Sequence, residues 1–313
     1  MRISATFLDE ISHDIPHQNW GRREWNEDFA LMKRIGIDTV VLIRCGYRHW
    51  LTYPSASLVQ TEHAFEPPVD LVRMFLDLSE EHAMRFFFGL YDSGRYWVNR
   101  EYRKELEVNR RVIDEVWNAY GSSPAFSGWY LSQECSRNVD GIADLYARLG
   151  DECKSISDGL PVMISPYIDG PKAVGQNDPR VSREEGVTVE MHEREWDAIF
   201  SAIRGSVDIV AFQDGHVGFH ELGAFLEVNK RLADRHGLSC WTNTETFDRD
   251  MPIKFLPIKW EKLLFKLRAA ARVGIRDAIT FEFSHFMSPQ SAYLQAGHLY
   301  DRYREYLESS ADA

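Results

Sequence analysis

The feature that most constrains this 313-residue sequence is the alternation of a short β-rich run with a longer amphipathic run, repeated about eight times. Eight such units predict parallel strands joined by right-handed helical crossovers, and closing that sheet into a barrel leaves no exposed strand edge. We therefore predict an α/β fold, a single (β/α)8 TIM barrel, with residues 1–313 forming one domain.

The predicted strands each precede a run with helical periodicity. The predicted helices cover about 22–35, 69–82, 99–120, a segment around 145–149, and 292–307. A stretch from about 170 to 187 is rich in Gly, Pro, Asp and Asn, and we interpret it as a long loop that could act as a mobile lid. The predicted strands are Ile3–Leu8, Thr39–Arg44, Arg85–Leu90, Phe126–Leu131, Pro161–Ser165, Asp208–Phe212, Ser239–Thr242 and Ala278–Phe283.

A doubly wound open sheet is the main alternative architecture. Such sheets usually bind nucleotides through a glycine-rich turn that opens a helix. The sequence contains no G-x-G-x-x-G and no P-loop at any predicted helix start, which favours the barrel.

Composition narrows the classes of partner. The formal net charge of -12 argues against nucleic acid, whose binding draws its affinity from clustered Lys and Arg. No apolar stretch approaches the roughly 20 residues of a transmembrane helix. The first ten residues reach Asp9 and Glu10 before an apolar run of signal-peptide length. We therefore expect a cytoplasmic protein with no membrane or nucleic-acid partner.

The four cysteines are widely spaced and form no C-x-x-C pair, so we expect buried free thiols rather than a zinc or redox site. They are Cys45, Cys135, Cys153 and Cys240.

Carboxylates and aromatic rings gather near the C-terminal ends of the predicted strands, where TIM barrels carry their catalytic residues. Flat rings beside carboxylates are typical of sugar sites, because a ring stacks on the apolar face of a sugar. The carboxylates are Asp9, Glu10, Asp92, Glu134, Asp169, Asp214, Glu245 and, within the eighth strand, Glu282. The aromatic residues are Trp20, Tyr47, Trp50, Tyr91, Trp97, Trp129, Tyr167, Trp241 and Phe247.

Two segments place a Glu just beyond an apolar strand: Gly128–Glu134 after the fourth and Cys240–Glu245 after the seventh. Retaining glycosidases need two carboxyl groups about 5 to 5.5 Å apart, one protonated and one ionised, whereas inverting enzymes space them about 6.5 to 9.5 Å apart. Our hypothesis is a retaining glycoside hydrolase with Glu134 as acid/base and Glu245 as nucleophile. Mutual repulsion should raise the pKa of Glu134 and give a bell-shaped pH profile.

These positions resemble those of the large clan of retaining barrel glycosidases, which carries its acid/base at strand four and its nucleophile at strand seven. Glu134 and Glu245 match that arrangement. The sequence departs from the clan at Gln133, where the clan usually has an Asn that bonds the sugar 2-hydroxyl.

A closer resemblance covers nearly the whole chain. Thr6–Glu10, Gln18–Gly21, Asp38–Arg44 and Tyr53–Ser55 are similar to the glycosidase-like barrel family catalogued as domain of unknown function 4434. This resemblance implies a bacterial hydrolase of carbohydrate metabolism, while the reaction still has to be argued from the site.

Supporting roles fall to nearby polar residues. Asn243 and Gln133 are expected to contact the sugar near the cleaved bond, and Tyr167 to tune the nucleophile through its hydroxyl. Arg44 can hold a carboxylate by two parallel hydrogen bonds and lower its pKa. Glu282 is expected to be buried and to orient the site. The other predicted substrate-binding residues are Asp9, Glu10, Trp20, Tyr47, Asp92, Gln213, Asp214 and Trp241.

Two other functions remain open. His216 and His220 have the spacing of a helical metal pair, but the Glu of H-E-x-x-H is missing, and we favour a surface pair with no metal and no cofactor. The first alternative is nevertheless a metal-dependent sugar isomerase or epimerase, and the second is an inactive barrel that binds carbohydrate. The isomerase would draw its ligands from Glu134, Asp169, Asp214, His216 and Glu245.

Overall fold

The computed structural model describes residues 1–12, 15–170, 186–249 and 255–311. Most of the loop predicted to act as a lid, residues 171–185, lies outside the described residues.

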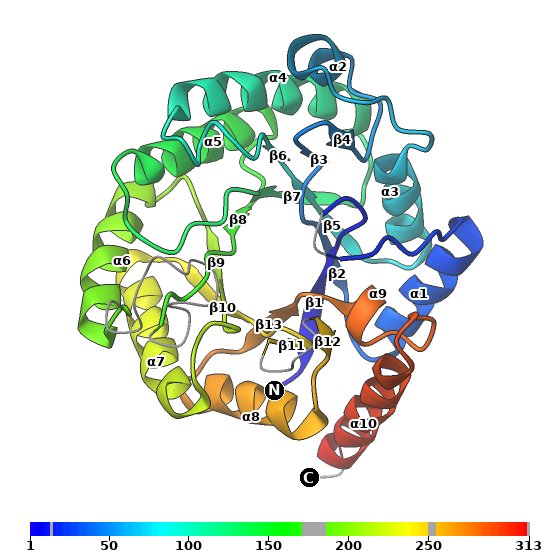
Figure 1. The fold of residues 1–313 in the computed structure, drawn as a ribbon, viewed down its shortest axis with the longest axis vertical. Helices are drawn as coiled ribbons and strands as arrows, with labels where there is room; N and C mark the ends of the chain where they lie inside the picture. The colour runs from blue at the N-terminus through cyan, green and yellow to red at the C-terminus, as the bar shows by residue number, and fades with distance from the viewer. Residues whose placement is uncertain (13–14, 171–185, 250–254, 312–313) are drawn as a thin grey trace.

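Eight parallel strands close into a barrel, which confirms the predicted (β/α)8 fold (Figure 1). Each strand pairs with the next barrel strand along the chain, and β1 pairs with both β2 and β13 to complete the ring. The barrel strands, in chain order, are β1 (Ile3–Leu8), β2 (Thr39–Leu42), β5 (Arg85–Gly89), β7 (Phe126–Leu131), β8 (Val162–Ile164), β9 (Ile209–Gln213), β10 (Ser239–Asn243) and β13 (Asp277–Thr280).

Amphipathic helices form a ring around the barrel (Figure 1). Some begin at side-chain caps: Asp70 accepts a hydrogen bond from the backbone N–H of Arg73, and Thr188 from that of Met191. The helices of the ring are α1 (Arg22–Arg34), α3 (Leu71–Glu81), α4 (Tyr102–Tyr120), α5 (Ile142–Ile156), α6 (Val189–Ile203), α7 (Phe219–His236), α8 (Trp260–Arg272) and α10 (Leu294–Ala311).

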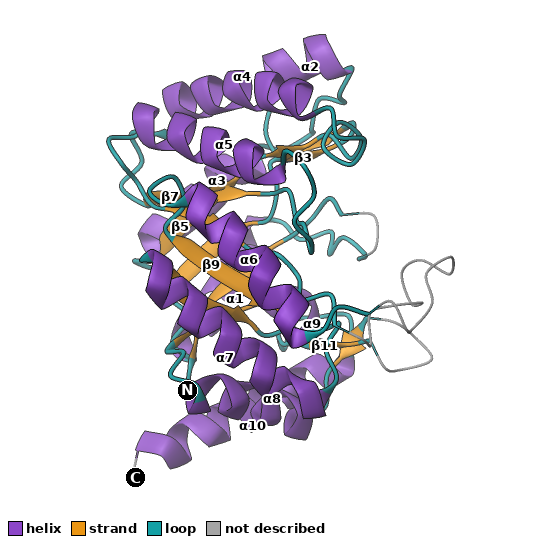
Figure 2. Cartoon of the chain, turned by 90° about the vertical axis from the view of Figure 1, so that its left-hand side faces the viewer, coloured by secondary structure: helices purple, strands orange, loops and turns teal. Residues whose placement is uncertain are grey.

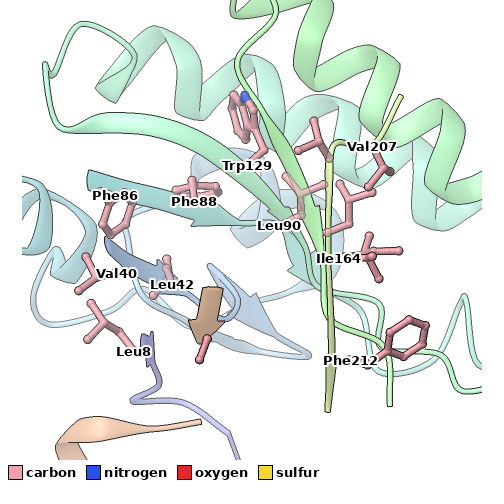
Figure 3. Packing of buried hydrophobic residues seen from close by; sticks show 14 of the residues in the cluster. Leu8, Val40, Leu42, Phe86, Phe88, Leu90, Trp129, Ile164, Val207 and Phe212 are labelled. Atoms are coloured by element: carbon pink, nitrogen blue, oxygen red, sulfur yellow. The ribbon is translucent and has the colours of Figure 1, made fainter. Parts of the chain in front are cut away.

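Two apolar layers lie on the two sides of the sheet, because successive residues of a strand point to opposite faces. On β7, Trp129 packs outward against the helices and donates its indole N–H to Ser157 at the end of α5. The next residue, Tyr130, belongs to the layer inside the barrel. Figure 3 shows part of the outer layer, including Phe86 and Phe88 of β5.

Short additional elements lie at the C-terminal end of the barrel strands (Figure 2). A three-stranded sheet joins β4, β3 and β6, and a two-stranded sheet joins β11 and β12. These elements, and two short helices, were not predicted. They are β3 (Gly46–Tyr47), β4 (Trp50–Leu51), β6 (Tyr91–Asp92), β11 (Phe247–Asp248), β12 (Leu256–Pro257), α2 (Ala56–Glu62) and α9 (Phe283–Phe286).

The end of the eighth barrel strand differs from the prediction. β13 stops at Thr280, so Glu282 follows the strand instead of lying within it. The Glu282 carboxylate accepts hydrogen bonds from the backbone N–H groups of Ser284 and His285, and it thereby caps α9. The barrel strand therefore ends three residues earlier than the predicted Phe283, and the chain turns into this capped helix.

The four cysteines are free and buried, as predicted. Among the described residues, no helix combines the length and the apolar character needed to span a membrane.

Candidate active site

Glu134 and Glu245 line the same small cavity, of about 80 Å³, at the C-terminal end of the barrel. Glu134 follows β7, the fourth barrel strand, and Glu245 follows β10, the seventh. The lining of this catalytic cavity combines carboxylates, guanidinium groups and phenyl rings. It consists of Asp9, Ser12, Ile15, Ile43, Arg44, Glu134, Gln213, Glu245, Phe247, Arg249, Phe255 and Phe281.

A larger groove of about 370 Å³ adjoins the catalytic cavity, and the two share Ser12, Arg44 and Glu134. Its volume falls in the range of about 300 to 1,000 Å³ that is usual for small-molecule sites. The remaining residues that line the groove are Tyr47, Arg48, Asp92, Gly94, Trp97, Val98 and Ser132.

Glu245 is buried and held by a guanidinium group. Arg249 donates from Nε to Oε2 at 3.0 Å and from Nη2 to Oε1 at 2.9 Å. Burial alone would raise the pKa of Glu245, but the charge and hydrogen bonds of Arg249, with a further contribution from Lys266, hold it below its usual value. Glu245 is therefore suited to remain ionised at neutral pH.

The loop before α7 leaves room for this ion pair. A Cβ atom on Gly215 would lie 1.7 Å from Oε2 of Glu245, so only glycine fits there. The neighbouring Asp214 accepts the backbone N–H of Glu245 at 3.2 Å and the Lys266 ammonium at 2.7 Å. Asp214 thus positions the backbone of Glu245 and does not line the catalytic cavity, contrary to its predicted contact with substrate.

Glu134 has the opposite electrostatic character. Burial raises its pKa above the usual value, and it outweighs the lowering effects of Arg44 and of the Tyr130 hydroxyl, which donates to Oε1 at 2.9 Å. The pKa of Glu134 is raised, as we expected, but the expected cause, repulsion between the two carboxylates, was wrong. Desolvation, and not repulsion by Glu245, is the main cause of the raised pKa of Glu134.

Arg44 pairs with Asp92 and not with the candidate nucleophile Glu245. Its Nη1 lies 3.3 Å from Oδ2 of Asp92, and its charge also faces Glu134 and Asp9. The cation beside Glu245 is Arg249, so Arg44 compensates acids on the Glu134 side of the cavity.

Asp9 presents an unused oxygen to the catalytic cavity. Oδ1 accepts the backbone N–H groups of Ile11 and Ser12 at 3.1 and 3.0 Å. Oδ2 is buried and has no hydrogen-bond partner within the described parts of the chain. A sugar hydroxyl would satisfy it.

Two predicted tryptophans belong to the packing of the protein. Trp20 makes an edge-to-face contact with Trp25, with ring centroids 5.0 Å apart, at the start of α1. Trp241 lies inside the barrel, and its indole N–H donates to Ser239 at the first position of β10. Neither lines the catalytic cavity or the groove.

The predicted glutamine and asparagine side chains also fall into two groups: one lines the catalytic cavity, and the others bond to the protein elsewhere. Gln213 lines the catalytic cavity and makes a polar contact with Glu134. Gln133 is buried beside it in sequence, but its amide donates to the Tyr91 carbonyl and to Glu105. Asn243 donates to Ser165 at 3.0 Å. Of the three, only Gln213 is placed to contact a bound sugar.

Glu282 is buried and Glu10 is half-buried, the charge of His285 faces both, and neither Glu lines the catalytic cavity. Glu282 accepts a hydrogen bond from Nδ1 of His285 at 2.7 Å, so this buried carboxylate has an imidazole partner. Burial lowers the pKa of His285, but Glu282 outweighs it and raises that pKa to about 9. Burial raises the pKa of Glu10 to about 7.

The residues proposed for a metal site do not gather into one metal-binding group in the described parts of the chain. His216 precedes α7, is buried, and contacts the Tyr167 ring at 5.3 Å between centroids, whereas the side chain of His220 is exposed. The two histidines therefore do not form a helical pair. Within the described residues, no three His, Cys, Asp or Glu side chains are grouped to hold a metal.

Tyr167, which was predicted to tune the nucleophile, does not line the catalytic cavity. The tyrosine hydroxyl that contacts a candidate catalytic residue is that of Tyr130, which donates to Glu134.

The other predicted aromatic residues differ in whether they line the catalytic cavity or the groove. Tyr47 and Trp97 line the groove, and Phe247 lines the catalytic cavity. Trp50 is 60% exposed and packs on Phe65. Tyr91 is buried and, like Trp129, lines neither space.

Several lining residues were not predicted from the sequence. Arg249 could have been suggested by its basic charge close behind Glu245, but Ser12, Arg48, Phe255 and Phe281 carry no signal that separates them from ordinary loop residues.

Residues 3–293 match the family described as Domain of unknown function (DUF4434). Among solved structures, the chain is similar to a protein named "putative alpha-L-fucosidase" from Bacteroides thetaiotaomicron VPI-5482. The two share 59% identity and a TM-score of 0.93 over 98% of this chain and 93% of that one.

More distant likenesses concern the fold alone. The endo-1,4-beta-D-mannanase of Thermotoga petrophila RKU-1 is 13% identical, with a TM-score of 0.57 over 90% of this chain and 87% of that one. The beta-galactosidase of Marinomonas ef1 is 12% identical, with a TM-score of 0.60 over 99% of this chain and 60% of that one. No curated protein matches the sequence.

Proposed function

The chain belongs to the DUF4434 family, and from that premise we propose that it is a glycoside hydrolase in which Glu134 and Glu245 cleave a glycosidic bond. The observation that carries the proposal is that two carboxyl groups, Glu245 buried and Glu134 half-buried, line one cavity at the barrel mouth and have pKa values displaced in opposite directions. Pairs of carboxyl groups whose surroundings separate their pKa values are how glycosidases obtain one acid and one base.

In the proposed retaining mechanism, Glu245 attacks the anomeric carbon while Glu134 donates its proton to the departing oxygen. The sugar is then bound covalently to Glu245. Glu134, now ionised, removes a proton from a water molecule that attacks the same carbon, and Glu245 leaves as a carboxylate. Arg249 binds both oxygens of Glu245, and each oxygen keeps a lone pair for the attack.

Other residues of the catalytic cavity fit the binding of a sugar. The free Oδ2 of Asp9 and the amide of Gln213 can pair with hydroxyl groups, and the rings of Phe247 and Phe281 can cover an apolar sugar face. The name of the Bacteroides relative makes an L-fucoside a first substrate to test. The fold shared with the mannanase and the beta-galactosidase agrees with glycoside hydrolysis but does not select a sugar.

The test is hydrolysis of a panel of aryl glycosides, including L-fucosides, by wild type, Glu134→Gln and Glu245→Gln. Glu245→Gln should lose at least about a thousandfold in kcat/KM on every substrate, because the nucleophile is gone. Glu134→Gln should lose about 10²- to 10⁴-fold on poor leaving groups and much less on dinitrophenolates, which need no proton.

Glu115→Gln is the matched control. This carboxylate binds Ser55 and Ala56 at the start of α2, outside the catalytic cavity and the groove, so turnover should be unchanged. The anomeric form of the first product, followed by NMR, distinguishes retention from inversion. Turnover that survives both active-site substitutions, or that a chelator abolishes, would contradict the proposal and favour the isomerase.

A further inference from the structure

The groove beside the catalytic cavity contains a guanidinium group without an acidic partner. Arg48 lines the groove, and within the described residues no Asp or Glu oxygen lies within 4.0 Å of its side-chain nitrogens. Its guanidinium carbon lies 5.0 Å from the centre of the Tyr47 ring, and this ring is its aromatic support.

The backbone of Arg48 is fixed. Arg48 adopts a positive φ of 55°, which is uncommon for a residue with a side chain. Its N–H donates to the Asp92 carbonyl at 3.1 Å, and its carbonyl accepts the Tyr91 hydroxyl at 2.7 Å. A Cβ atom on Gly94 would lie 2.8 Å from Nε of Arg48, so glycine at that position makes room for the side chain.

The acids near Arg48 are already engaged. Oδ1 of Asp92 accepts the Gly94 N–H and the Trp97 indole N–H, both at 2.8 Å, and Oδ2 faces Arg44 at 3.3 Å. On the far side of Arg48, Glu62 pairs with Arg95 at 2.7 Å.

The groove therefore carries more positive than negative charge when Glu134 holds the proton that its acid role requires. Besides Glu134, two guanidinium groups, Arg44 and Arg48, and one carboxylate, Asp92, line the groove, and Arg44 also faces Asp9 in the adjoining catalytic cavity. The protein as a whole has a formal net charge of -12, so the charge of the groove is opposite in sign to the charge of the protein. An anion would be attracted to this groove in particular.

We infer that the groove binds a negatively charged sugar, whose carboxylate or sulfate pairs with Arg48 while its ring packs against Trp97. The inference rests on the proposed function, because it makes this groove a subsite next to the bond that Glu134 and Glu245 cleave. Arg48 is a binding residue that selects the charge of the substrate, and a guanidinium fork matches either anion by two parallel hydrogen bonds.

The test is calorimetric binding of methyl glycosides to the full chain, which needs no turnover. The probes are the glycosides of glucuronic acid, galacturonic acid and galactose 6-sulfate, each in both anomeric forms, with neutral glucose and galactose glycosides for comparison. At least one acidic glycoside should bind about tenfold to a hundredfold more tightly than its neutral counterpart. The preference should weaken as salt is added. Uronic acids and the sulfated sugar distinguish carboxylate from sulfate recognition.

Variants assign the effect to Arg48. Arg48→Met should abolish the preference for the acidic sugar, and Arg48→Lys should retain part of it. Arg103→Met removes the same charge from an exposed pair with Glu107 on α4 and should leave the preference intact.

Equal binding of acidic and neutral sugars, no binding of any acidic sugar, or a preference that survives Arg48→Met would overturn the inference. These outcomes are distinct from failure of the proposed function, which is decided by turnover in Glu134→Gln and Glu245→Gln. An enzyme that hydrolyses only neutral glycosides, with both Glu residues required, would retain the function and lose this subsite.

Discussion

At the residue scale, the two candidate catalytic carboxyl groups show how surroundings give one residue type two roles. Glu245 is buried and Glu134 is half-buried, and desolvation disfavours the ionised form of each. Glu245 has a guanidinium bound to both oxygens, whereas Glu134 is contacted by the neutral Tyr130 hydroxyl and Gln213 amide and shares Arg44 with other acids. The charge and geometry of the nearest donor therefore decide the direction in which each pKa moves.

Replacing Arg249 should test this account directly. In Arg249→Met, the largest effect that opposes burial is lost and the pKa of Glu245 rises, so the acidic limb of the kcat/KM profile should move to higher pH by roughly one unit or more. Arg249→Lys keeps the charge and should shift the limb less. An acidic limb that stays in place in Arg249→Met would show that another group sets it.

The sequence could identify the two Glu residues because a carboxylate just beyond a barrel strand has few other positions to occupy. It could not identify side-chain direction. Trp129 and Tyr130 are neighbours on β7, yet one packs under the helices and the other supports Glu134 from inside the barrel. Gln133 and Trp241 were misplaced for the same reason, since direction depends on where each strand ends and the loop begins.

At the element scale, the long strands and helices were predictable, whereas the elements at the barrel mouth were not. β1 and β7 have the predicted bounds because their alternating pattern ends in polar residues. The pairs of residues in β3, β4 and β6 are too short to show a period, and tertiary contacts alone create them. Tyr47 and Asp92, which line the groove, lie on these short strands.

The loop between β9 and α7 should tolerate no side chain at Gly215. Gly215→Ala places a Cβ atom on the Glu245 carboxylate and must displace it, so kcat/KM should fall by about a hundredfold, the cost of roughly 1 Å of misplacement. Gly223→Ala, within α7, meets no atom within 4 Å. It should leave activity unchanged and raise the free energy of unfolding by about 0.5 to 1 kcal/mol. Steady-state kinetics and urea unfolding measure the two effects, and full activity in Gly215→Ala would contradict the described position of Glu245.

At the scale of the whole molecule, buried acids make stability depend on pH in an unusual direction. Burial raises the pKa of Asp28, Glu10 and Glu105 to about 7 each. The folded state thus binds more protons than the unfolded state between the usual pKa and about 7. The stability that these groups contribute is present at low pH and is lost as the pH rises through about 7.

We expect the free energy of unfolding to fall between pH 5 and pH 8. Asp28 is fully buried and accepts hydrogen bonds from Ser284 and Ser288. Asp28→Asn removes one titrating group, so the slope of stability against pH should decrease by up to about 1.4 kcal/mol per pH unit. Urea unfolding at four pH values measures the slope in both proteins. An unchanged slope would mean that Asp28 does not titrate in this range.

The shared position of Arg44 has a consequence for how this site can evolve. One guanidinium faces Asp9, Asp92 and Glu134, which follow three different barrel strands. Losing Arg44 would leave three acids uncompensated, and losing one acid would change the charge that the other two experience. Substitutions here are therefore epistatic: the effect of each depends on which of the others has already changed. A lineage can alter this side of the mouth only along ordered paths. Arg48 has no ion pair with an Asp or Glu of the described residues, so it can change in a single step, and the proposed substrate preference should change with it.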